Sequence, residues 1–122
     1  MAVTAKSMGD RAEARALEHL LREGLALVCR NYRVARGPRA RGGEIDLILR
    51  ERDGTLVFVE VRSRAGAAYG GALASVTATK QRSLVFAAQH YLAQLAHAPP
   101  CRFDVVAVEG TALQWVRAAF DA

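Results

Sequence analysis

Hydrophobic and polar residues alternate most strictly over residues 43–64, GEIDLILRERDGTLVFVEVRSR. Two alternating runs flank Asp53-Gly54, and this pattern predicts a β-hairpin with a three-residue loop that ends at Gly54. That loop length places Asp46 directly opposite Glu60, whereas a two-residue turn would place Asp46 opposite Val61. In either register the two acids are neighbours within a segment that otherwise has the composition of a core hairpin.

The same alternation assigns the hairpin side chains to two faces. One face is aliphatic and carries Ile45, Leu47, Leu49, Val57, Val59 and Val61. The other face is mixed and carries Glu44, Asp46, Ile48, Phe58, Glu60 and Arg62. Facing carboxylates on neighbouring strands repel each other unless a cation lies between them. We therefore treat Asp46 and Glu60 as a candidate site, with an ion pair to Arg62 as the structural alternative.

Two further segments have helical periodicity. Residues 10–23, followed by Gly24, predict an amphipathic helix. Its apolar stripe contains Leu17, Leu20 and Leu21, and one turn earlier the stripe reaches Glu13. We expect Glu13 on the core side of this helix, unless it serves only as an acid favoured near a helix N-terminus.

The second helix is predicted from Thr77 or Thr79 to about His97, before Pro99-Pro100. Its stripe consists of Leu84, Ala88, Tyr91, Leu92 and Leu95. Strand patterns cover residues 26–34, 101–109 and 112–120. The order α, β, β, β, α, β, β in 122 residues predicts one α/β domain, residues 1–122, with a mixed β-sheet flanked by helices.

The positive charge of the chain is concentrated in one stretch. Seventeen Lys and Arg residues against twelve Asp and Glu residues give a net charge of +5. Residues 30–41 hold five arginines and no acid: Arg30, Arg33, Arg36, Arg39 and Arg41. Because guanidinium groups bind phosphate oxygens bidentately, we expect these arginines to contact nucleic acid. The alternative is a solvated loop.

Other features limit the compartment and the chemistry. No apolar run approaches the roughly 18 residues of a membrane span, and the N-terminus lacks the apolar core of a signal peptide. We expect a cytoplasmic protein with no membrane partner. Cys29 and Cys101 form no CxxC motif and are expected to be buried hydrophobic residues.

The acids favour a hard cation. Asp46 and Glu60, with Glu13 approaching from the first helix, offer only oxygen ligands, which suit Mg²⁺ or Mn²⁺. Glu44 is a further candidate metal ligand, unless it is simply exposed at the start of its strand. A cation at this place, with substrate phosphate as its remaining ligand, is typical of phosphodiester hydrolysis.

Several motifs together resemble a known family. They are Glu13, RNYR at 30–33, GEIDLI, FVEVR, Lys80 and RFDVV at 102–106. This set resembles the YraN-like bacterial family, and GEIDLI with FVEVR resembles the D…(D/E)xK motif of restriction-endonuclease-like nucleases. The family is similar to archaeal Holliday-junction resolvases in its nuclease core. The resemblance implies a restriction-endonuclease-like core of αβββαβ order, with Asp46 and Glu60 as metal ligands.

One residue departs from that motif, because Arg62 stands where the superfamily has lysine. Arginine stays protonated, so Arg62 can stabilise charge but cannot activate water, and Lys80 is the candidate for the missing ammonium group. Three functions follow: an endonuclease acting on branched or nicked DNA, a non-catalytic nucleic-acid-binding domain, or a module that docks an acidic protein. Symmetric cutting of two strands would fit a homodimer.

Overall fold

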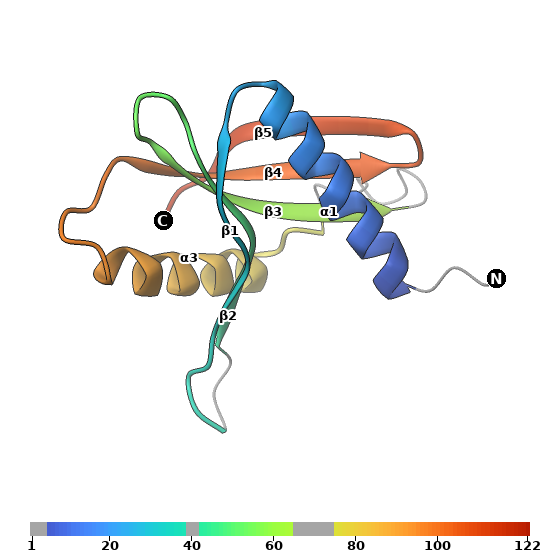
Figure 1. The fold of residues 1–122 in the computed structure, drawn as a ribbon. Helices are drawn as coiled ribbons and strands as arrows, with labels where there is room; N and C mark the ends of the chain where they lie inside the picture. Colours follow the sequence, from blue (N-terminus) through green and yellow to red (C-terminus); the bar gives the residue numbers. More distant parts are fainter. Residues whose placement is uncertain (1–4, 39–41, 65–74) are drawn as a thin grey trace.

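The computed structural model describes residues 5–38, 42–64 and 75–122 (Figure 1). Its elements are α1 (Ala5–Arg22), β1 (Ala26–Val34), β2 (Gly43–Arg50), β3 (Leu56–Arg64), α3 (Ala78–Ala93), β4 (Cys101–Glu109) and β5 (Ala112–Phe120). This order confirms the one predicted from the sequence. Helix α1 begins five residues before the predicted start at residue 10, and α3 ends at Ala93 rather than at His97.

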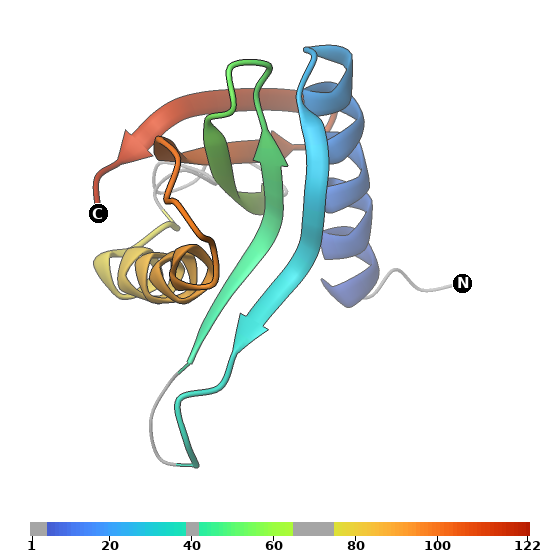
Figure 2. The same cartoon turned by 60° about the vertical axis from the view of Figure 1, so that its left-hand side comes forward.

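The five strands form one mixed sheet in the order β1-β2-β3-β4-β5. Neighbouring strands are antiparallel except β3 and β4, which are parallel and are connected through α3. A parallel pair needs such a long crossover, because its second strand starts at the end of the sheet opposite to where the first one stops. Figure 2 shows α1 and α3 on opposite faces of the sheet, as the mixed-sheet prediction required.

The sequence explains where α1 ends and where α3 begins. Gly24 has φ +98°, and Leu25 N donates to Leu20 O while Gly24 N donates to Leu21 O, each at 3.1 Å. This pair of bonds is the Schellman ending, which needs a left-handed residue and therefore favours glycine. At the start of α3, the Thr77 hydroxyl accepts a hydrogen bond from Lys80 N and caps the helix.

The predicted hairpin register is confirmed. Leu47 pairs with Val59 and Arg50 with Leu56, while Glu51 N donates to Thr55 O across the loop at 2.9 Å. Gly54 has φ +94° and supplies the left-handed position of the three-residue loop. The β2–β3 ladder ends at Leu47, although β2 continues to Gly43 paired with β1. Asp46 therefore lies where β2 leaves β3.

Two core clusters fill the two faces of the sheet. On the α1 face, three helix residues pack against strand residues: Ala12, Ala16 and Leu20 against Leu47, Leu49, Val57, Val59, Val106 and Val108. On the α3 face the packed residues are Leu84, Ala87 and Ala88 with Ile45, Ile48, Leu56, Phe58 and Phe103. Placing Leu21 on the buried stripe of α1 was wrong, because its exposed fraction is 46%.

The predicted face of Ile45 was also wrong. Ile45 packs with Ile48 on the α3 side, whereas Leu47 and Leu49 pack on the α1 side. Strict alternation fails between Ile45 and Leu47 because β2 loses β3 as a partner there, and a two-stranded ribbon twists more than a full sheet. The change of twist turns the end of β2 around α3.

The expectations about the cysteines and about membrane spans have separate outcomes. Cys29 is half-buried and packs against the core cluster on the α3 face, whereas Cys101 is exposed at the start of β4, so the core prediction was wrong for Cys101. Both thiols are free. None of the described helices is both long and apolar enough to cross a membrane.

Gly43 lies in the tight contact between β2 and α3, and this contact leads to a testable prediction. A Cβ at Gly43 would lie 2.4 Å from Ser83 O and 2.9 Å from the Ala87 Cβ. Because β2 and α3 would have to separate, we expect Gly43→Ala to lower the free energy of unfolding by about 1–3 kcal/mol in urea denaturation. Gly9→Ala is the control, since nothing lies within 4 Å of a Cβ there. Equal losses in both variants would contradict this packing.

Candidate active site

Three carboxyl groups gather where β2 and β3 separate. Asp46 comes from β2, Glu60 from β3 and Glu13 from α1. The Val61 amide of β3 donates to Asp46 Oδ2 at 2.8 Å, which fixes Asp46 beside the strand that carries Glu60. Glu60 has an exposed fraction of only 2%. The structure thus brings together the two predicted metal ligands and the glutamate of the first helix.

Two cations reach the same oxygen of Glu60. Lys80 Nζ lies 3.5 Å and Arg62 Nη1 lies 3.4 Å from Glu60 Oε1. Arg62 is also held by its Nε, which donates to Ser75 Oγ at 2.8 Å. Lys80 is in the first turn of α3, so the N-terminal end of that helix places its ammonium group at the carboxylates. The proximity of Lys80 to the site, predicted from the sequence, is confirmed.

Two buried carboxylate oxygens have no hydrogen-bond donor among the described residues, namely Glu13 Oε1 and Glu60 Oε2. Buried polar atoms usually have hydrogen-bond partners, and a buried carboxylate without one costs free energy of folding. Asp104 shows the contrast, because it is fully buried yet accepts from Arg102 Nε, Trp115 Nε1 and Ala118 N at 2.9–3.0 Å. Asp104 therefore serves the fold, whereas Glu60 and Glu13 retain unused acceptor capacity.

The surroundings raise the pKa of all three carboxyl groups. Burial, followed by the Asp46 charge, raises the pKa of Glu60 to about 8, although the Lys80 and Arg62 charges oppose the rise. Burial is also the main cause of the raised pKa values of Asp46 and Glu13. The neighbouring Asp46 and Glu60 carboxyl groups influence each other's pKa. The site would thus be stabilised by additional positive charge.

This shift predicts an unusual dependence of stability on pH. Because the folded pKa of Glu60 lies above its ordinary 4.5, the folded state holds a proton that the unfolded chain has released, and stability falls as pH rises from about 5 to 9. Asp46 and Glu13 act in the same direction, while Lys80 and Arg62 reduce the effect. A rise in the pKa of Glu60 from 4.5 to about 8 corresponds to a loss on the order of 5 kcal/mol across this window in urea unfolding.

The variant Glu60→Gln should remove most of that pH dependence, because the glutamine does not titrate. Glu18→Gln is the matched control, since Glu18 is an exposed glutamate of α1 paired with Arg22. A slope in Glu60→Gln as steep as in the wild-type protein would show that Glu60 is not the titrating group.

The carboxylates fit a hard divalent cation with few protein ligands. Among the described residues, no three His, Cys, Asp or Glu side chains form a ready-made metal cage. Mg²⁺ does not need one, because it is usually held by one or two carboxylates together with waters and substrate phosphate. Asp46 and Glu60 supply such a pair, and the donor-free Glu60 Oε2 is the observation that fits a cation.

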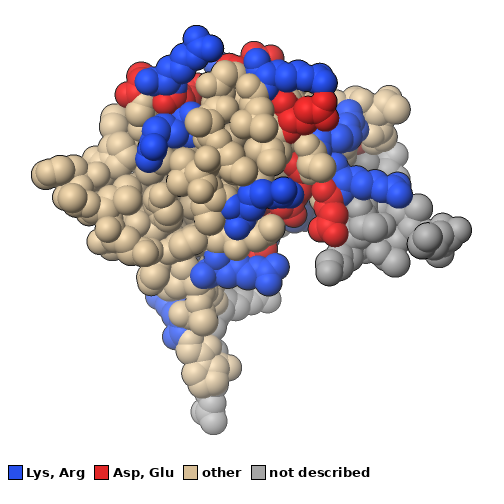
Figure 3. Space-filling view, in the orientation of Figure 1, with Lys and Arg blue, Asp and Glu red and all other residues tan. Residues whose placement is uncertain are grey.

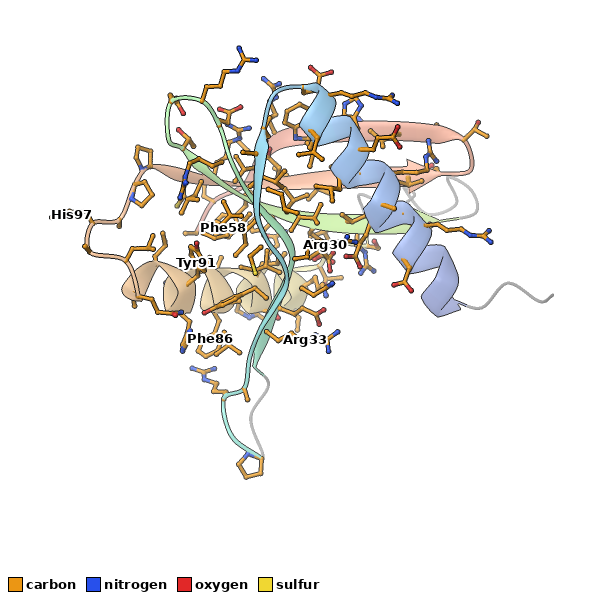
Figure 4. The ribbon with its side chains drawn as sticks, in the orientation of Figure 1. Arg30, Arg33, Phe58, Phe86, Tyr91 and His97 are labelled. Atoms are coloured by element: carbon orange, nitrogen blue, oxygen red, sulfur yellow. The ribbon has the colours of Figure 1, made fainter. Side chains whose placement is uncertain are left out.

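Glu44, the remaining predicted metal ligand, forms an ion pair with one of the predicted phosphate-binding arginines. Glu44 is paired with Arg33, whose Nε lies 3.3 Å from Glu44 Oε1, so the expectation of an unpaired arginine cluster was wrong for Arg33. Arg30 is exposed on β1, and its charge lowers the pKa of Glu13. Figure 4 shows Arg30 and Arg33 along β1, the strand predicted over residues 26–34. Arg39 and Arg41 lie outside the described residues.

Sequence reasoning missed a groove beside the carboxylates. An open cavity of about 500 Å³, called here the α3 groove, is lined by Arg36, Arg62, Lys80, Arg82, Phe86 and hydroxyl-bearing residues that include Thr79. Arg36 was predicted as a phosphate contact, but Arg82 and Phe86 were not singled out. The spacing of Thr79, Arg82 and Phe86 by three and four residues could have revealed them as one helix face opposite the apolar stripe.

Charged side chains of both signs lie next to one another over the region where α1 crosses the sheet (Figure 3). Acids interspersed with arginines and lysines allow a cation to be held while an anionic partner approaches.

Comparisons with known proteins identify relatives over nearly the whole chain. The model of the uncharacterised protein family UPF0102 matches residues 12–108. A UPF0102 protein of Methylibium petroleiphilum is 66% identical over 120 residues, which cover 98% of each chain. A UPF0102 protein of Acidovorax sp. is 63% identical over 119 residues, covering 98% of this chain and 88% of that relative. The names of these relatives describe no activity.

Proposed function

The chain belongs to the uncharacterised protein family UPF0102, and we propose that it is a metal-dependent endonuclease that cuts DNA, with branched or nicked DNA as its substrate. The single observation that carries this proposal is the buried Glu60, which lies beside Asp46 and within 3.5 Å of both Lys80 and Arg62. A buried acid pair bordered by two cations combines the charges that phosphodiester hydrolysis requires.

Asp46 and Glu60 would hold Mg²⁺ or Mn²⁺, and Glu13, whose pKa is raised by burial and by the Asp46 charge, would add negative charge beside them. Glu44 is the weaker candidate metal ligand, because its carboxylate already forms an ion pair with Arg33. When bound, the ion would supply a Lewis acid for a phosphate oxygen and for water. The Val61 amide keeps Asp46 in place, so this ligand is positioned before any cation arrives.

The two cations have separate roles in this proposal. Lys80 supplies the ammonium group that the superfamily motif places two residues after the glutamate, because lysine can give up a proton in a site of this kind. Arg62 stays protonated and, held by Ser75 and Glu60, stabilises negative charge that develops on the phosphate. The departure of Arg62 from the motif is thereby compensated by a residue from α3.

The arrangement of elements supports a restriction-endonuclease-like core. The order α1, β1, β2, β3, α3, β4 matches the αβββαβ order that the resemblance implies, and the mixed sheet carries the acids on its second and third strands. We therefore propose this fold for the domain. In that proposal the hairpin supplies the metal ligands and α3 supplies the lysine.

The experiment that tests the function is cleavage of end-labelled DNA of four kinds: linear, nicked, flapped and four-way-junction. Each is incubated with Mg²⁺ or Mn²⁺ and, in parallel, with EDTA. We expect cutting that requires the metal and is faster on the branched or nicked substrates. No cutting of any substrate with either metal would contradict the proposal.

The alternative is a non-catalytic nucleic-acid-binding domain, and one specific observation favours it. Arg62 occupies the lysine position of the motif and cannot lose its proton. A binding domain of this kind would show affinity that falls steeply with salt and survives Asp46→Ala, without strand cleavage.

A further inference from the structure

The α3 groove opens directly at the carboxylates but has a different chemical character. Its lining includes four cationic side chains, Arg36, Arg62, Lys80 and Arg82, and no acid among its described lining residues. Two of these, Arg62 and Lys80, are the cations that contact Glu60. A second cavity of about 430 Å³ shares Arg36, Arg82 and Phe86 with the groove and continues along α3. Arg36 and Arg82 therefore carry the cationic lining into this second cavity, which Asp121 also lines.

An aromatic ring lies within this basic lining. Phe86 is half-buried on α3 and is absent from the described residues that make up or pack against the two core clusters. The Arg36 guanidinium carbon lies 4.6 Å from the centre of the Phe86 ring. Figure 4 shows Phe86 at α3, near the far ends of β1 and β2. The Arg36 guanidinium thus lies over the face of the Phe86 ring, and both residues line the groove.

A guanidinium stacked on an aromatic ring, with further cations in the same lining, matches the chemistry of a nucleotide. A base stacks on an aromatic ring or a guanidinium plane, and the phosphates on either side of it pair with the cations. In continuous duplex DNA both faces of each base are already stacked, so reaching Phe86 would require unstacking. The groove therefore favours a base that is already unpaired.

From this geometry we propose that the α3 groove binds an unpaired nucleotide of single-stranded DNA, stacked against Phe86 and Arg36. This inference rests on the proposed function, which places the bond to be cut at the carboxylates. The groove adds the class of substrate, which is DNA with a single-stranded segment at the site, such as a flap or a gap, rather than continuous duplex. Arg82 and Lys80 contact the phosphates of the bound strand.

The test measures binding without cutting, by fluorescence anisotropy in EDTA. The probes are a fluorescein-labelled single-stranded oligonucleotide and the blunt duplex of the same sequence. Phe86→Leu keeps an apolar side chain on α3 but removes the ring, and we expect it to weaken single-strand binding about tenfold while duplex binding changes less than about twofold. Phe86→Tyr keeps the ring and should bind as the wild-type protein does.

Arg36→Gln should weaken single-strand binding and reduce its salt dependence. Arg117→Gln is its matched control, because the Arg117 guanidinium also lies over an aromatic ring, 4.0 Å from the centre of Trp115 on β5, but outside the groove. Arg117→Gln should leave single-strand binding unchanged. Thermal melts of all four variants check that each is folded.

Two outcomes overturn the inference: single-strand affinity unchanged in Phe86→Leu, or equal losses on single strand and duplex. A cleavage assay run beside the binding assay separates this failure from that of the proposed function. Metal-dependent cutting with no Phe86 effect would leave the nuclease proposal intact and remove the groove assignment. Selective loss of single-strand binding in Phe86→Leu, with no cutting by the wild-type protein, would support the groove assignment and contradict the nuclease proposal.

Discussion

Asp46→Asn and Glu60→Gln should each lower the affinity for Mg²⁺ or Mn²⁺ by more than about a hundredfold, because loss of groups that only support metal ligands already costs about 10–100-fold. Both substitutions keep the shape of the side chain and remove its charge. The measurement is a metal titration by calorimetry, together with the rise of the melting temperature that the metal produces. Burial of Glu60 should make Glu60→Gln at least as stable as the wild-type protein without metal.

Glu18→Gln is the control for this prediction as well, because it removes an exposed carboxylate from α1 and should not change metal affinity. Glu13→Gln should have a smaller effect than either main variant, since Glu13 comes from a different element. Unchanged metal affinity in both Asp46→Asn and Glu60→Gln would contradict the assignment of the site.

Lys80→Met should reduce the single-turnover rate of DNA cleavage by about 10²–10³-fold, within the range of a general acid–base or charge-stabilising group. Lys80→Arg should not restore the rate, because arginine cannot give up its proton. Arg62→Lys should keep most of the activity, since it retains a cation next to Glu60 Oε1. Single-turnover conditions are needed so that product release does not hide the chemical step.

Arg50→Met is the control for the charge change, because Arg50 is exposed at the loop end of β2, far along the strand from Asp46. Wild-type rates in Lys80→Met, combined with a large loss in Arg62→Gln, would assign the cationic role to Arg62 and contradict the role given to Lys80.

Local patterns were sufficient to predict the hairpin and the acids of the site. Asp53-Gly54 defined the loop, the loop defined the register, and the register brought Asp46 close to Glu60. Glu13 followed from helical spacing, because residues one turn apart share a face. These inferences depend on neighbours in sequence or on a single turn, and for this reason they could be made without the fold.

Features that depend on long-range packing could not be predicted in the same way. Ile45 changed face because β2 continues beyond the end of β3, a length difference that alternation within the hairpin does not reveal. Arg33 pairs with Glu44 because β1 lies beside β2, and this strand order was not fixed by the sequence. The α3 groove needs residues from four segments: the chain after β1, the end of β3, Ser75 and α3.

The measurement that tests the central claim most directly is cleavage of a labelled flapped DNA in Mn²⁺, with the wild-type protein and Glu60→Gln in parallel reactions. The account predicts cutting by the wild-type protein, none by Glu60→Gln, and none by either protein in EDTA. Equal cutting by both proteins would show that the activity does not depend on this carboxylate. No cutting by the wild-type protein, with DNA still bound, would contradict the nuclease proposal and leave a nucleic-acid-binding domain.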